Sequence, residues 1–193
     1  MNVINPKLFS LAPYQIAAFE KNGYIILPQW LSGEALAAMQ QLAQLQFKKP
    51  SEPWELEAQL GYPGAPASAA HEGGYTTRRL LGAYRRDPMW QSYATNPSLK
   101  NCLQQLFKHP DIFLSQAHHN CLMTKSPRFS SDTGWHQDSR YWRFAKPELI
   151  TAWLALGRET SSNGGLQVIP GSHRQTFLAE HFDKKAFFLA NKP

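Results

Sequence analysis

Apolar positions in the N-terminal half of the chain recur at helical spacing. Between residues 33 and 47 they fall on one face of a helix, at Leu36, Met39, Ala43 and Phe47. Ser32 stands directly before this segment as a candidate N-cap. Two more helices are predicted by similar signals. One has Ser10 as its candidate cap, runs through Glu20 and is ended by Asn22-Gly23, and the other covers 97–108 with Asn96 as its cap.

Apolar runs of strand length predominate in the C-terminal half. Residues 112–124 predict one long strand or two short ones, 150–156 a buried strand, and 166–169 another strand entered through a Gly-rich turn. The short apolar run at 24–27 also suits a strand, whereas the prolines and glycines of 50–75 predict a long loop. Helices first and strands afterwards indicate an α+β domain, with helices flanking a β-sandwich or barrel.

The composition is that of one globular domain. The chain has 193 residues, of which 42% are hydrophobic and 18% charged. We find no secretory signal at the N-terminus and no apolar run long enough to span a membrane. The two cysteines, Cys102 and Cys121, cannot form a disulfide framework and lack metal-pair spacing. We therefore expect a reduced, cytoplasmic protein.

The formal net charge of +6 is carried partly by adjacent basic pairs, at 48–49, 78–79 and 85–86. Such pairs could attract an anionic partner, such as nucleic acid or an acidic substrate. They could equally form an ordinary solvated surface. We favour the solvated surface, because the pairs are not interleaved with aromatic residues that could stack on bases.

The most specific local feature is the sequence GWHQD at 134–138. On an extended segment, His136 and Asp138 point to the same side, because side chains alternate. One imidazole nitrogen and one carboxylate oxygen could then bind a single metal. Iron(II) oxygenases commonly use two histidines and one carboxylate on one face. A His-x-Asp pair alone is common by chance, so its sequence context decides how it is interpreted.

Three blocks supply that context, and their order and spacing resemble those of the phytanoyl-CoA dioxygenase family: FEKNGYIILPQWLSGEAL, GWHQDSRYWRF and ITAWLALGRETSSNGGLQVIPGSHR. The resemblance extends from Phe19 to Arg174. It implies an Fe(II)- and 2-oxoglutarate-dependent oxygenase with a double-stranded β-helix (jelly-roll) core. We expect a single dioxygenase domain over 1–193, with 1–110 a mainly helical flank and 111–193 the first part of the jelly roll.

The resemblance also implies roles for individual residues. His136 and Asp138 match the family's first two iron ligands. Trp153 matches a residue that walls the 2-oxoglutarate pocket, and we expect it to be largely buried; the alternative is a plain core tryptophan. Gln116 and Asn120 match an amide pair near the co-substrate, the alternative being polar strand residues that face solvent.

Other residues near the motifs receive structural or peripheral roles. His173 resembles a loop histidine of the family that does not bind iron. We expect His118 and His119 to be structural, because neighbours on a strand face opposite ways. The three residues after the iron motif are expected to border the substrate mouth: Arg140, Tyr141 and Trp142.

Two parts of the family pattern have no counterpart after Arg174, namely the second iron histidine and the arginine that holds 2-oxoglutarate. The C-terminal strands of the jelly roll are apparently missing as well. We favour a fragment of a longer protein over a truncated gene product or a site completed by another chain. We expect the 193-residue chain by itself to show no 2-oxoglutarate turnover.

The expected reaction is hydroxylation of a small organic substrate, such as an acyl-CoA, an amino acid or another metabolite, with O₂ as co-substrate. Asp138 favours hydroxylation, because halogenating relatives carry a small residue at this position. The rival interpretations are a non-catalytic binding domain of the same fold and, less favoured, a nucleic-acid-binding module. We expect neither nucleic acid nor a membrane as a partner.

Overall fold

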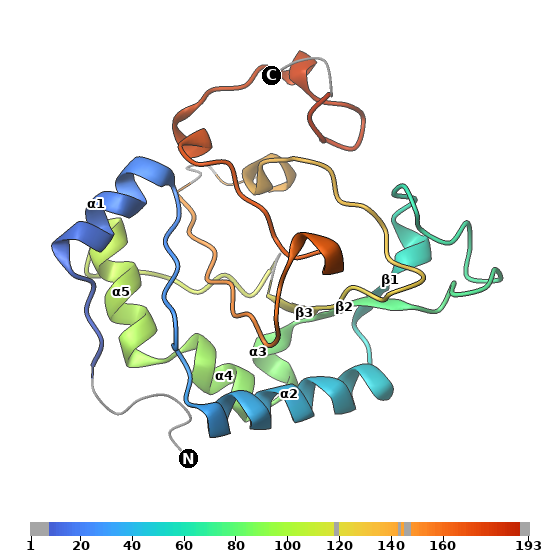
Figure 1. The fold of residues 1–193 in the computed structure, drawn as a ribbon, viewed down its shortest axis with the longest axis horizontal. Helices are drawn as coiled ribbons and strands as arrows, with labels where there is room; N and C mark the ends of the chain where they lie inside the picture. The colour runs from blue at the N-terminus through green and yellow to red at the C-terminus, as the bar shows by residue number, and fades with distance from the viewer. Residues whose placement is uncertain (1–7, 118–119, 143, 145–147, 190–193) are drawn as a thin grey trace.

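The computed structural model describes residues 8–117, 120–142, 144 and 148–189. Helices occupy the left and lower sides in Figure 1, a small sheet lies to their right, and the C-terminal third runs through the centre and across the top mostly as irregular chain. The helices are α1 (Pro13–Asn22), α2 (Gly33–Lys48), α3 (Ala83–Arg86), α4 (Pro88–Ala94) and α5 (Pro97–Phe107). The strands are β1 (Trp54–Leu56), β2 (Thr77–Leu81) and β3 (Cys121–Met123). No helix in these ranges is long and apolar enough to cross a membrane.

Helices α2 and α5 begin at the predicted caps. The Ser32 hydroxyl accepts a hydrogen bond from the Ala35 amide at 3.1 Å, and the Asn96 side-chain oxygen accepts from the Ser98 and Leu99 amides. These bonds satisfy amides that have no partner within the helix. The helices predicted over 33–47 and 97–108 are therefore confirmed, with boundaries within one residue.

Helix α1 was predicted with the wrong cap. It begins at Pro13, and Ala12 is its N-cap, with the Gln15 side chain accepting from the Ala12 amide. The Ser10 hydroxyl instead accepts a hydrogen bond from the Asn101 side chain at 2.8 Å, which ties the N-terminal segment to α5. Helix α1 ends at Gly23, whose φ of 82° is readily adopted by glycine.

The sheet is antiparallel, in the order β1-β2-β3. Leu80 on β2 pairs directly with Leu122 on β3. A single buried cluster joins this pair to α2 and α4 through Met39, Ala43 and Trp90. The core therefore lies between the sheet and these two helices.

Several strand predictions are wrong. Residues 24–27, 150–156 and 166–169 form no strand, the run at 112–124 shortens to β3, and β1 lies inside the predicted loop 50–75. An apolar run becomes a strand only where another backbone lies alongside to pair with it. The mixed helix-and-sheet character is confirmed, whereas the sheet in the described residues has three strands and does not confirm the jelly roll.

Two of the sequence blocks meet in space. The Gly171 amide donates to the Asn22 carbonyl at 2.8 Å, and His173 Nε2 donates to the Glu20 carbonyl at 3.2 Å. A Cβ on Gly23 would lie 2.3 Å from the His173 ring, so only glycine allows this approach. The turn containing His173 therefore docks on the end of α1.

Candidate active site

His136 and Asp138 lie together. The His136 Nε2 and Asp138 Oδ1 atoms are 3.2 Å apart, and both side chains are partly buried. Trp135 lies at a bend, Gln137 has an extended backbone (φ −111°, ψ 122°), and Asp138 begins a 3-10 turn (Asp138–Tyr141). Because Gln137 between them is extended, the two side chains lie on the same side, and the 3-10 turn then carries the chain away from them.

The neighbours of His136 determine which ring nitrogen carries a proton. Nδ1 lies 2.8 Å from the Gly134 carbonyl oxygen, which can only accept, so Nδ1 must donate. Nε2 therefore faces the Asp138 carboxylate. The hydrogen bond to Asp138 raises the pKa of His136 above its ordinary value; burial acts in the opposite direction, and the bond to Gly134 adds to the rise.

This pair fits two positions around one metal ion. Ligand atoms about 2 Å from a metal and at right angles to each other lie about 3 Å apart. The observed 3.2 Å is close to that separation. Within residues 8–117, 120–142, 144 and 148–189, no third His, Cys, Asp or Glu completes a metal-binding group.

The C-terminal segment supports the motif from one side. Phe187 is buried, and its ring centroid lies 5.9 Å from that of His136. A Cβ at Gly134 would come within 2.9 Å of the Phe187 ring, so the glycine permits this contact. The Phe188 amide donates to the Trp135 carbonyl at 2.8 Å. Packing and a backbone bond therefore both restrain the segment that carries His136.

A buried ion pair next to the motif was missed by the sequence analysis. Arg78 was assigned to a solvated surface pair, but it is 1% exposed, and Glu57 is 0% exposed. Arg78 Nη1 lies 3.6 Å from Glu57 Oε2 and donates to the buried Ser131 hydroxyl at 2.5 Å. The missed signal is strand alternation, because Arg78 stands two residues before Leu80 and so shares its inward face.

Gln116 and Asn120 both lie against α3. The Gln116 side-chain oxygen accepts from Arg85 Nε at 3.1 Å, and the Asn120 side-chain oxygen accepts from the Tyr84 amide at 2.9 Å. Asn120 is half-buried directly before β3, while Gln116 is exposed on irregular chain. The strand predicted over 112–124 is shortened to β3, so it includes neither Gln116 nor Asn120.

Trp153 is 45% exposed, so the prediction that it is largely buried is wrong. Its indole Nε1 donates to the Glu159 carboxylate at 2.8 Å. The reason is that 150–156 is unpaired chain rather than a strand inside a sheet. His118, His119 and the side chains of Arg140 and Tyr141 lie outside the described residues, and the Trp142 ring meets Phe144 edge-on.

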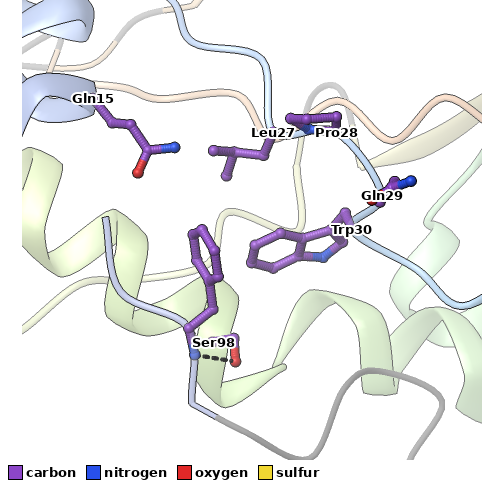
Figure 2. Close-up of a pocket in the computed structure, with 7 residues that line it drawn as sticks. Gln15, Leu27, Pro28, Gln29, Trp30 and Ser98 are labelled. Atoms are coloured by element: carbon purple, nitrogen blue, oxygen red, sulfur yellow. Dashed lines mark hydrogen bonds between the residues drawn. The ribbon is translucent and has the colours of Figure 1, made fainter. Parts of the chain in front are cut away.

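A cavity of about 220 Å³ lies between the N-terminal segment, the chain before α2 and the start of α5. Figure 2 shows its lining, and none of these residues was predicted for the site: Phe9, Gln15, Leu27, Pro28, Gln29, Trp30 and Ser98. The Gln15 side-chain oxygen is engaged in capping α1. This cavity is therefore part of the helical packing and contains no predicted catalytic residue.

A histidine and a carboxylate whose ligand atoms lie 3.2 Å apart define a candidate mononuclear metal site. The family model of phytanoyl-CoA dioxygenase (PhyH) matches residues 19–190, and the chain belongs to this family. That range includes both His136 and Asp138. The relatives are named as dioxygenases, which makes this an oxygenase family.

Individual relatives share about a quarter of their residues with this chain. A probable phytanoyl-CoA dioxygenase of Caenorhabditis elegans is 26% identical over 90% of this chain and 56% of its own length. An ectoine dioxygenase of Bordetella parapertussis is 25% identical over 86% of this chain and 51% of its own length. The chain thus spans about half the length of these curated relatives. No solved structure matches it.

Proposed function

We propose that this chain belongs to an Fe(II)- and 2-oxoglutarate-dependent dioxygenase and carries two of its iron ligands, His136 and Asp138. The observation that carries the proposal is the 3.2 Å approach of His136 Nε2 to Asp138 Oδ1, in a family whose relatives are named dioxygenases. The double-stranded β-helix core, with 1–110 as flank and 111–193 as its first part, belongs to the same proposal. The relatives' names do not support the non-catalytic alternative.

Iron, when bound with 2-oxoglutarate, supplies the oxygen activation needed for hydroxylation. His136 contributes Nε2, and in the protonated ring, which Asp138 stabilises, this nitrogen must lose its proton before it can bind the metal. Metal binding should therefore release a proton and weaken as the pH falls. The Gly134 carbonyl keeps the other nitrogen protonated and so keeps Nε2 directed at the metal position.

The co-substrate residues are also proposed. The amides of Gln116 and Asn120 can hydrogen-bond carboxylate oxygens, and the Trp153 indole can form an apolar wall. For the substrate we propose a small organic molecule, such as an acyl-CoA, an amino acid or another metabolite. The names of the relatives mention phytanoyl-CoA and ectoine, which supports a small-molecule substrate but does not identify which one.

The proposal predicts metal binding that depends on both ligands. In a Co(II) titration followed by visible absorption, His136→Ala and Asp138→Ala should each weaken binding at least about tenfold, because each removes a direct ligand. His71→Ala is the matched control, since His71 is exposed and bonded to the neighbouring Ser68 hydroxyl. Affinity that is equal in all four proteins would refute the assignment.

Turnover is the second readout. Any active form of the protein should release succinate with Fe(II), ascorbate and 2-oxoglutarate, and the His136→Ala substitution in that form should abolish the release. Succinate release that persists in this variant would show that the iron is held elsewhere.

A further inference from the structure

We propose that Arg78 and Glu57 are positioning residues, which fix residues 130–133 and thereby hold His136 and Asp138 in the geometry of a metal site. The inference rests on the proposed function for its consequence, whereas the fixing of the segment can be measured without metal. Neither residue touches the His136–Asp138 pair in any contact described above. Their effect is transmitted through the chain that precedes His136 and, for Arg78, also through the rings of Tyr62 and Phe187.

The ion pair is almost completely removed from solvent. Arg78 and Ser131 are each 1% exposed, and Glu57 is 0% exposed. Burial lowers the pKa of the Arg78 guanidinium, and the nearby glutamates oppose that shift. A buried ion pair often adds no more stability than apolar residues of similar volume. Its advantage is directional, since charged hydrogen bonds hold their partners at defined positions.

Ser131 is held from several directions at once. Glu57 Oε2 accepts from both the Ser131 amide, at 3.0 Å, and its hydroxyl, at 2.5 Å. Arg78 donates to the same hydroxyl, and Lys125 Nζ donates to the Ser131 carbonyl at 2.5 Å. The next amide, of Asp132, donates to the Pro63 carbonyl at 2.8 Å. Little rotation of this stretch is possible while these bonds persist.

A polar route leads from Arg78 to the imidazole. Arg78 Nη2 donates to Thr133 Oγ1 at 3.0 Å. The following residue, Gly134, presents the carbonyl that accepts from His136 Nδ1 at 2.8 Å. Arg78 therefore restrains the residue before the carbonyl that orients the ring.

An aromatic route runs in parallel. The Arg78 guanidinium lies over the Tyr62 ring, 5.3 Å from its centroid. The Tyr62 and Phe187 rings meet at 4.9 Å, and Phe187 is the ring beside His136. Both routes start at Arg78 and end at His136. One guanidinium therefore restrains the imidazole through the Gly134 carbonyl and through the Phe187 ring.

Two pairs of variants separate positioning from general stability. Thr133→Val removes the hydroxyl that accepts from Arg78, while Thr133→Ser keeps it; Thr133 is exposed, so both should fold. Arg78→Lys keeps the charge but cannot reach Ser131, Thr133 and the carboxylates together. Its matched control is Arg128→Lys, which alters an exposed ion pair with Glu72.

The readouts are amide hydrogen exchange over 134–138, the nuclear Overhauser contact between the His136 and Phe187 rings, and Co(II) affinity. We expect Thr133→Val and Arg78→Lys to speed exchange over 134–138 and to weaken Co(II) binding by about tenfold. Thr133→Ser and Arg128→Lys should match the wild type, and Thr133→Val should keep its melting temperature.

Wild-type exchange rates and ring contacts in folded Thr133→Val would overturn the positioning role, whether or not Arg78→Lys folds. Failure of the wild-type chain to bind Co(II) would instead count against the proposed function. In that case the metal-free exchange rates would still decide the positioning role of Arg78.

Discussion

The two nitrogens of the His136 ring have different partners, and this difference determines what the side chain can do. Nδ1 is committed to the Gly134 carbonyl, whereas Nε2 faces a carboxylate that favours a positive charge there. A proton or a divalent cation can supply that charge. The two compete for the same atom, so the proposed metal site and the ion pair would be alternative states of one pair of residues.

The reactivity of the two cysteine thiols also depends on their surroundings. Cys102 is 3% exposed, and burial raises its pKa to about 11; burial likewise raises the pKa of Cys121. Because the thiolate is the reactive form, both should resist iodoacetamide at pH 8 in the native protein. Mass spectrometry should find both alkylated once urea unfolds the chain, and rapid native alkylation of Cys102 would contradict this.

At the scale of single elements, helices and strands differ in how far along the chain the residues that determine them lie. A helix pairs its own backbone within four residues and is ended by caps next to it in sequence. Helices α2 and α5 accordingly begin at Ser32 and Asn96, as predicted. A strand depends on a partner strand from elsewhere in the chain. Residues 166–169 have no such partner in the described part of the chain, and their apolar side chains are about half exposed: Leu166, Val168 and Ile169.

The cap of α5 offers a test of local specification. Asn96→Ala removes the oxygen that accepts from Ser98 and Leu99, and should lower the free energy of unfolding by about 1 kcal/mol. Asn96→Ser keeps a capping oxygen and should retain most of the stability. Urea unfolding of the three proteins would measure this, and equal midpoints for Ala and Asn would argue against the cap.

At the scale of the whole molecule, one small core joins two helices to the sheet. Leu80, at the centre of this core, is 0% exposed, whereas Leu45 on α2 is 66% exposed. Leu80→Ala should lower the free energy of unfolding by about 2–5 kcal/mol, since it leaves a cavity. Leu45→Ala, the same substitution on the surface, should change it by less than about 0.5 kcal/mol. Similar unfolding curves for the two variants would show that the core lies elsewhere.

Much of the site was accessible from the sequence because its geometry is local. His136 and Asp138 are two residues apart, and the extended Gln137 between them brings them to one side. The burial of Arg78 was not predicted, because an adjacent basic pair is expected to face solvent unless its strand and its buried carboxylate partner are known. Glu57 and Ser131 lie 74 residues apart and become neighbours only when the chain folds.

The sequence by itself determined the family, the main helices and the pair of candidate ligands, since each depends on residues close together in the chain. Tertiary structure alone decided which apolar runs pair as strands, that Trp153 is exposed, and that Arg78 and Glu57 are buried against Ser131. The physical reason is the same in each case. Backbone pairing and desolvation depend on which distant segments come together, and helical periodicity and residue spacing do not encode that choice.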